Sequence, residues 1–365
     1  MVELQGNELV FKSPKVHHDA TCRLGFQRTL RIPDDNRDYP LPAGLGRFPL
    51  EHVRHHANRV PQDWNDHGGV LLPMFQAEAM WVQFPSGRRH DSAYPFAIKI
   101  AAGKINAITG EPWRDALTDQ PQDYVTTPGQ PWIDGFCVQK GMIRQFIAMP
   151  LGQGYTAEEQ ITGAAEHGGL QIVAYPMKRE RYEQLCEERK ARQRAWLTAL
   201  GILLDDIPEP PTPTKKSKHG IQPSMKRIRQ VDFQRDTSMG LAPGGLMRQE
   251  IYADKFGIDA WDQTNPSRCF VHILNSEQWQ TVTGKAVPGR PPNAAAYERA
   301  GLPWFEYYGD GENALEGADP LAWLDSVAAT DVKKGHKPQP DNVPIQPPHT
   351  VALGPKARTV DDGRW

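Results

Sequence analysis

Two pairs of short apolar runs, each joined at a glycine, constrain the fold of this chain most strongly. The first pair lies in Tyr94–Thr109 and bends at Gly103, and the second lies in Trp132–Ala148 and bends at Gly141. Each pattern is typical of a β-hairpin, and two consecutive hairpins predict an antiparallel sheet. The 33 Pro and 32 Gly residues also favour many short strands over a bundle of long helices. The segment Leu71–Phe84 fits a helix by propensity and a strand by its flanking Pro and Gly.

Helical signals are fewer than strand signals. Residues 178–204 form the only long helical pattern, with apolar side chains among many charges. Short helices are predicted at 49–60, after the capping box Thr156-x-x-Glu159, after Asn275, after Asn293, and from Asp319 to Ala329. The sequence therefore predicts a β-rich α+β fold, with an antiparallel sheet or β-sandwich body, one long helix and several short helices.

The domain organisation follows from length and from the distribution of proline. A chain of 365 residues is long enough for two domains or for one large body. Residues 1–204 are predicted to form a β-rich body with a helical arm, and 205–229 a Pro- and Lys-rich linker or exposed loop. Residues 230–330 are predicted to form a second α+β part packed on the same body, and 331–365 a Pro-rich tail.

Charge and cysteine usage exclude several classes of protein. A formal net charge of -2 provides no overall field for binding nucleic acid or an anionic membrane. The four cysteines never approach a Cys-x-x-Cys spacing, so no zinc ribbon or dithiol motif is present. No apolar run is long enough to cross a bilayer, and no signal-peptide pattern opens the sequence. These features predict a cytoplasmic protein without a membrane span.

Histidines provide the first candidate site. On a helix over 49–60, His52 and His56 would face the same way, and two imidazoles at this spacing can share a metal. His67, or an acidic residue between Asp63 and Asp66, would complete the site if the chain folds back. The alternative is a partly exposed polar helix face. No His-Glu-x-x-His motif is present, and the sequence indicates no cofactor.

The other catalytic sequence motifs that we considered are absent. The sequence contains no Gly-x-Ser-x-Gly elbow, no complete dinucleotide fingerprint and no phosphate loop. Cys137 or Asp134 could form a catalytic pair with His167 only if the fold brings them together, and a buried thiol is the commoner role for a cysteine in a hairpin strand.

Two further segments are candidates for binding. Lys215, Lys216 and Lys218 begin a basic stretch over 215–229, which predicts an electrostatic adaptor. The stretch has no aromatic residues for base stacking, so nucleic acid is an unfavoured partner. Trp304, Phe305, Tyr307 and Tyr308 form an aromatic segment, which either fills the core or anchors a partner protein.

Five strings resemble the signatures of an uncharacterised family of microbial proteins, some of which carry an attached ubiquitin-like domain. They are Gln130–Gly135, Met142–Pro150, Gly163–Gln171, Met239–Gly245 and Gly301–Tyr308. The resemblance covers roughly residues 70–325 and implies one body rather than two independent domains. It supplies no catalytic residue, and the absence of a ubiquitin-like segment here argues against a ubiquitin-linked role.

The leading functional prediction is a non-enzymatic protein-binding or structural protein, with self-assembly as one form of it. The partner would be a protein or a second copy of the chain. A metal-assisted hydrolase using the histidines near 52–67, and an electrostatic adaptor using 215–229, are the two alternatives.

Overall fold

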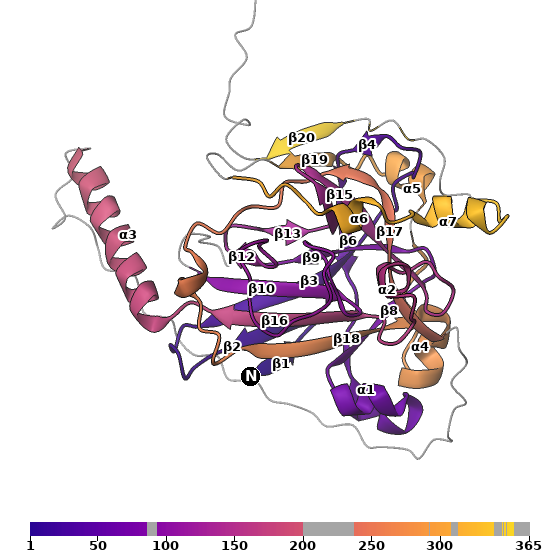
Figure 1. Cartoon of the computed structure of the whole chain (residues 1–365), viewed down its shortest axis with the longest axis horizontal. Coiled ribbons are helices and arrows are strands. Elements are labelled where there is room, and N and C mark those ends of the chain that lie inside the picture. The colour runs from indigo at the N-terminus through magenta and orange to yellow at the C-terminus, as the bar shows by residue number, and fades with distance from the viewer. Residues whose placement is uncertain are drawn as a thin grey trace, which may run out of the picture.

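The computed structural model describes residues 1–85, 93–199, 237–291, 293–307 and 313–338, together with 345, 347 and 349–353 (Figure 1). Strands predominate in these residues, and most pair in one large, mainly antiparallel sheet. One long helix and several short helices accompany the sheet. The predicted β-rich α+β fold is confirmed.

The strands of the large sheet follow the chain from the first residues to Asn275. They are β1 (Val2–Gln5), β2 (Glu8–Lys12), β3 (Thr21–Thr29), β4 (Asp38–Tyr39), β6 (Gly44–Arg47), β7 (Glu51–His52), β8 (Val70–Met74), β9 (Ala79–Gln83), β10 (Phe96–Ala102), β11 (Ile105–Asn106), β12 (Val125–Thr127), β13 (Trp132–Ile133), β14 (Gly135–Gln139), β15 (Met142–Pro150), β16 (Leu170–Pro176), β17 (Ser238–Arg248) and β18 (Ser267–Asn275). A small second sheet contains β5 (Leu41–Pro42), β19 (Trp304–Tyr307) and β20 (Thr350–Leu353).

The helices lie around the sheet. They are α1 (Gln62–His67), α2 (Ala157–Thr162), α3 (Arg179–Ala199), α4 (Ser276–Thr283), α5 (Ala294–Arg299), α6 (Asp319–Ala322) and α7 (Val327–Lys333), with the 3₁₀ helices η1 (Val53–Arg59) and η5 (Ile258–Ala260). The long helix α3 extends away from the sheet in Figure 1. No helix of the described residues is long and apolar enough to span a membrane.

Both predicted hairpins are present. β10 pairs with β11 across Gly103, and β14 pairs with β15 across Gly141. Both glycines have positive φ, +58° and +73°, a conformation that costs glycine little and other residues more. The ambiguous segment Leu71–Phe84 contains β9 and all of β8 except its first residue, so it forms strands and not a helix.

Strands from distant parts of the chain interleave in the large sheet. Its antiparallel neighbours run β1–β2–β3–β9–β15–β17–β18–β16–β10–β12, while β8 joins β18 and β4 joins β17 in parallel. β17 and β18 come after residue 236, yet they pair with β15 and β16. The segments before and after residues 200–236 therefore build one sheet.

One hydrophobic cluster joins the two ends of this sheet. Its buried members include Leu24 and Phe26 of β3, Ile98 and Ile100 of β10, and Val271 of β18. Because residues that alternate along a strand point to opposite faces, these positions define the core side of their strands. The opposite side of β10, β16 and β18 is called here the outer face.

Two helix predictions were wrong. Residues 49–60 do not form one amphipathic α-helix: Glu51–His52 is strand β7, and the 3₁₀ helix η1 follows with a kink at His56. Pairing of Glu51 and His52 with β8 removes the first turn of the expected helix. Residues 319–329 form two short helices, α6 and α7, because the Ser326 hydroxyl accepts a hydrogen bond from the Ala329 amide and begins a new helix.

Candidate functional site

Polar side chains lie on the outer face of three neighbouring strands. Strand register places Lys99 of β10 beside Val173 of β16, and Val173 beside Arg268 of β18. The next row contains Gln171 beside Phe270. Directly paired residues share a face of an antiparallel sheet, so these side chains all lie on the outer face, where Val173 is also buried. Lys99 is nevertheless only 1% exposed, because a loop covers it.

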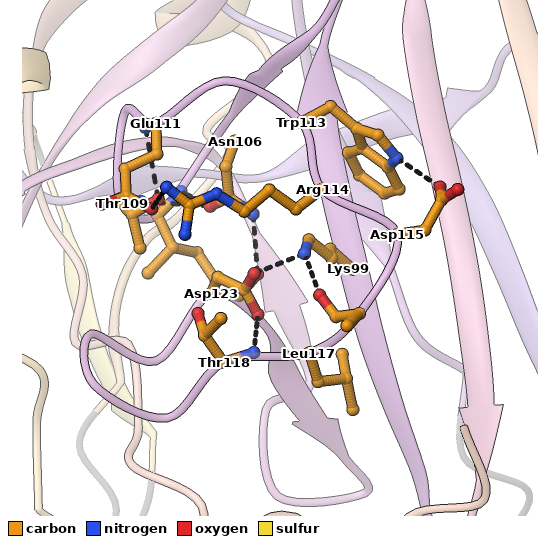
Figure 2. Close-up of polar contacts among 12 residues, drawn as sticks. Lys99, Asn106, Thr109, Glu111, Trp113, Arg114, Asp115, Leu117, Thr118 and Asp123 are labelled. Atoms are coloured by element: carbon orange, nitrogen blue, oxygen red, sulfur yellow. Dashed lines mark hydrogen bonds and ion pairs between the residues drawn. The ribbon is translucent and has the colours of Figure 1, made fainter.

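This covering segment, residues 107–124, is called the 107–124 loop. It connects β11 with β12 and returns over the outer face, where an ion pair joins the Lys99 ammonium to the Asp123 carboxylate (Figure 2). Lys99 also donates a hydrogen bond of 2.6 Å to the Ala116 carbonyl and lies 5.1 Å from the centre of the Trp113 ring. The loop is thus held to the sheet by a buried cation.

Asn106, the last residue of β11, supports the same loop from the position just before it. Its side-chain amide donates to the Asp123 carbonyl at 2.7 Å, and its side-chain oxygen accepts from the Ile108 and Thr109 amides at 2.8 and 3.0 Å. The Asp123 carboxylate accepts from the Thr118 amide at 3.0 Å. A loop with buried, satisfied polar contacts of this kind is a rigid platform for binding side chains.

A half-open cavity of about 420 Å³ lies beside this loop on the outer face, and it is called the outer-face cavity. The 107–124 loop, the end of α1, the segment before β16 and strand β18 all contribute to its wall. Its volume falls within the usual range for small-molecule sites. Side chains that matter for its chemistry are Lys104, Trp113, Asp115, His167, Gln171 and Arg268.

Asp115 and Arg268 form an ion pair on the rim of the cavity. The Trp113 indole N–H also donates to Asp115 at 2.9 Å, and Arg268 lies 5.8 Å from the Trp113 ring. Hydrogen bonding from Trp113, with the Arg268 charge adding to it, holds the pKa of Asp115 below its usual value. The three side chains therefore form an exposed polar rim, in which the Asp115 carboxylate is ionised.

Gln171 is the unusual residue of this wall. Its side chain is almost fully buried, and its amide nitrogen has no hydrogen-bond partner among the described residues. An unpaired buried donor costs about 1–3 kcal/mol, so most such groups in folded proteins find a partner. Gln171 lines the cavity through other atoms, because the nitrogen itself is enclosed by the protein.

His67, one of the predicted metal ligands, lies between the outer-face cavity and a second cavity of about 870 Å³. Its ring centre is 4.7 Å from that of Phe270 and 6.4 Å from that of His272. Burial lowers the pKa of His272 to about 4, so this imidazole is neutral, and its Nε2 proton is donated to the Gly68 carbonyl at 2.9 Å. His67 is thus part of an aromatic stack.

His52 and His56, the other predicted ligands, do not have the α-helical spacing on which the metal prediction depended. His52 ends β7 and lines the second cavity, and the His56 Nε2 atom lies 3.8 Å from the Glu51 carboxylate. Across the described ranges, three potential ligand atoms lie within 4.8 Å of one another only at His17, His18 and Asp19. A metal shared by His52, His56 and His67 remains a prediction without support from this geometry.

The half-buried His17 and the exposed His18 and Asp19 lie in the turn between β2 and β3. The His17 Nδ1 atom accepts a hydrogen bond from the Asp19 amide at 3.1 Å, which engages one of the lone pairs that a metal would need. The His17 ring also packs 5.1 Å from Tyr182. These contacts describe a structural turn.

The aromatic segment at 304–308 belongs largely to the core. Trp304 is 1% exposed and lies 5.7 Å from the Tyr297 ring, while Tyr307 lies 5.2 Å from Trp132. Burial leaves Trp304 without surface for a partner protein, so the core-filling alternative describes it. Phe305 is half-buried against the same core, and Tyr308 lies outside the described residues.

The cysteines of the hairpin and core are unsuited to nucleophilic catalysis. Burial raises the pKa of Cys22, Cys137 and Cys269 to about 12, and a thiol is a weak nucleophile until it loses its proton. Asp134 is also buried, and it accepts a hydrogen bond of 2.8 Å from Gln249. The basic residues Lys215, Lys216 and Lys218 lie outside the described part of the chain.

A third cavity, of about 660 Å³, lies on the other side of the 107–124 loop. Asp254 on its wall accepts hydrogen bonds of 2.7 Å from both the Tyr124 hydroxyl and the Trp261 indole. Several other carboxylates line this cavity, which makes it acidic in contrast to the outer-face cavity: Glu111, Asp119, Glu316 and Asp319.

The sequence reasoning missed Lys99, Asp123, Gln171 and Arg268. One signal was visible: Lys99 is the only charge in the apolar strand Phe96–Ala102, a place where an unpaired lysine would be costly. Its partner, 24 positions later by residue number, could not be identified without the fold. No protein-family model, no curated protein and no solved structure matches the chain.

Proposed function

We propose that this chain is a non-enzymatic binding protein whose β-rich body presents the outer-face cavity to a small molecule. The observation that carries the proposal is the rigid 107–124 loop, held on the sheet by the buried Lys99–Asp123 pair and forming one wall of the cavity. Binding sites are commonly built from loops fixed on a rigid sheet, since the scaffold removes the entropy cost of ordering the loop.

The chemistry of the wall also supports binding over reaction. Asp115 is ionised and paired with Arg268, and His272 is neutral and donates to a backbone carbonyl. These groups are fixed in single protonation states near neutral pH, whereas a general acid or base works best with a pKa near the working pH. Such groups orient a ligand through hydrogen bonds.

Nuclear magnetic resonance with a diverse fragment library tests this proposal. Ligands should shift the backbone amide signals of Lys104, Trp113, Gln171 and Phe270 together, since these residues line one cavity. Phe270→Ala should weaken the binding of each such ligand, while Trp323→Ala, which alters an 80% exposed side chain just after α6, should not. A library that shifts no signal in this group would contradict the proposal.

The earlier predictions concerning a partner protein and self-assembly stay predictions, as does the cytoplasmic location. Light scattering over a range of concentrations checks self-assembly, which requires a mass above that of the monomer. The electrostatic adaptor also stays a prediction, because its residues 215–229 fall outside the described ranges.

A further inference from the structure

We propose that the buried Lys99 and Asp123 side chains condense into an amide, which joins strand β10 covalently to the 107–124 loop. The ion pair between the two side chains is the arrangement from which this cross-link forms. The inference goes beyond the proposed binding function and requires no ligand. It rests on the burial of the pair, on the contact between the reacting groups and on the hydrogen bonds of the carboxyl group.

The pair lies where water is excluded. The Lys99 side chain is 1% exposed and the Asp123 side chain 6%, and the Trp113 ring lies 5.1 Å from the Lys99 nitrogen. Burial penalises both charges. Transfer of one proton from the ammonium to the carboxylate gives a neutral amine and a neutral acid, so burial favours the two species that can react. The exposed pair of Lys140 and Glu316 stays hydrated and ionised.

The reacting groups are held in contact. Strand register places Ile98 of β10 opposite Val125 of β12, so Lys99 lies beside the residues that lead into β12. Its Nζ atom contacts the Asp123 Oδ2 atom and donates a hydrogen bond of 2.6 Å to the Ala116 carbonyl. Groups fixed in this way react as if at effective concentrations on the order of 10⁵–10⁸ M. The fold thus supplies the proximity that amide formation needs.

The two oxygens of the Asp123 carboxyl group have different surroundings. Oδ1 accepts a hydrogen bond of 3.0 Å from the Thr118 backbone amide, while Oδ2 contacts the Lys99 nitrogen (Figure 2). A backbone N–H at this position stabilises the negative charge that develops on Oδ1 when an amine adds to the carbon. The Asn106 side chain fixes the Asp123 backbone by donating to its carbonyl at 2.7 Å. Oδ1 therefore remains as the amide oxygen, and Oδ2 leaves.

The reaction needs no added reagent. The Lys99 ammonium gives one proton to Oδ2, and the neutral Nζ atom adds to the Cγ atom of Asp123. A second proton passes from Nζ to Oδ2, the Cγ–Oδ2 bond breaks, and Oδ2 leaves as water. The new Nζ–Cγ amide keeps the last hydrogen of Nζ, so one amine and one acid give one amide and one water. Exclusion of water from the site also slows the reverse hydrolysis.

The cross-link has the effect on the 107–124 loop that a disulfide has in other proteins. The four cysteines of the chain are free. A covalent bond between residues 99 and 123 limits the conformations of the unfolded chain, which stabilises the fold relative to it. The connection should therefore survive denaturants and high salt, which disrupt an ion pair.

Mass spectrometry of the intact, denatured protein tests the inference. The wild-type mass should lie below the mass calculated from the sequence by one water molecule, and a digest should contain a branched peptide that joins Lys99 to Asp123. Lys99→Arg keeps a cation beside Asp123 but provides no nucleophilic amine, so it should have the full calculated mass. Lys140→Arg makes the same change in the exposed pair with Glu316 and should still lack one water.

Two results would overturn the inference. The first is a wild-type mass equal to the calculated mass after prolonged incubation of the folded protein. The second is a loss of water that maps to another position, such as Asp134 before Gly135. Neither result bears on ligand binding in the outer-face cavity, which the fragment library tests separately. The wild-type measurement decides the question even if Lys99→Arg does not fold.

Discussion

Lys99 shows how one residue can decide the structure of a whole loop. Its ammonium is buried beneath the 107–124 loop, where Asp123 and the Ala116 carbonyl replace the water that it would otherwise bind. A buried ion pair adds little net stability compared with a well-packed apolar pair, but loss of one partner leaves the other charge buried and uncompensated. The pair therefore stabilises one arrangement of the loop over others.

Removal of this lysine should destabilise the protein strongly. Lys99→Met should lower the free energy of unfolding by about 3–5 kcal/mol, because Asp123 is left buried without its counter-ion. Lys140→Met breaks the exposed pair with Glu316 and should cost no more than about 1 kcal/mol. Urea denaturation measures the free energy of unfolding of both variants. Equal decreases would show that burial of the Lys99 pair does not contribute to stability.

Asp134 provides a pH-dependent prediction at the same scale. Burial raises its pKa from 3.8 to about 7. The folded protein thus holds this proton more tightly than the unfolded chain, and the free energy of unfolding should fall as the pH rises from 3.8 to about 7.

Asp134→Asn keeps an oxygen acceptor for Gln249 but removes the titration. The stability of the wild type relative to this variant should fall across that pH range by on the order of 4 kcal/mol. Thermal denaturation at several pH values measures the difference. Glu183→Gln, on the exposed side of α3, is the control. If the stability difference between the wild type and Asp134→Asn changes with pH as little as the difference between the wild type and Glu183→Gln, the raised pKa of Asp134 is contradicted.

At the scale of elements, the β14–β15 hairpin contains two glycines with different roles. A Cβ atom at Gly135 would lie 1.9 Å from the Arg144 carbonyl oxygen of the paired strand, whereas a Cβ at Gly141 would meet nothing within 4 Å. Gly141 instead has a positive φ of 73°. One glycine is required for strand contact and the other for turn conformation.

The two substitutions should therefore differ in cost. Gly135→Ala should destabilise the protein by about 3 kcal/mol or more, because strand backbone cannot move away as a side chain can. Gly141→Ala should cost about 1–2 kcal/mol, the usual penalty of the left-handed conformation. Chemical denaturation of both variants gives the comparison, and a smaller loss for Gly135→Ala would exclude close strand contact as the reason for this glycine.

Elements were also the scale at which the sequence was most informative. Both hairpins, the α2 capping box and the Asn275 cap of α4 follow from local residue patterns, and all are present. The helix over 49–60 failed because pairing of Glu51 and His52 with β8 overrides a local helical pattern. The residues of the candidate site could not be predicted for a related reason. Lys99, Gln171 and Arg268 come to the same face through strand register, which cannot be read from any short stretch of sequence.

At the scale of the whole molecule, the order of strands joins the two halves of the chain. β17 lies between β15 and β18, and β18 pairs with β16, so the part before residue 200 lacks two internal strands of its own sheet. Exposed strand edges in an incomplete sheet favour aggregation.

Residues 1–204 expressed alone should therefore be insoluble or should lack the near-ultraviolet circular dichroism of packed aromatic rings. Co-expression with residues 230–365 should restore a soluble complex with that signal, since the second fragment supplies β17 and β18. A folded, monomeric 1–204 fragment would contradict the dependence of the sheet on these strands.

Hydrogen-bonded backbone amides in the 107–124 loop should slow the exchange of their hydrogens with solvent. Loop amides usually exchange their hydrogens quickly, because few of them are hydrogen-bonded. Here the Ile108, Thr109 and Thr118 amides donate to the Asn106 and Asp123 side chains on the buried outer face. Deuterium should therefore enter these three amides as slowly as it enters the amides of the adjoining strands. In hydrogen-exchange rate, this irregular loop should match the sheet beneath it.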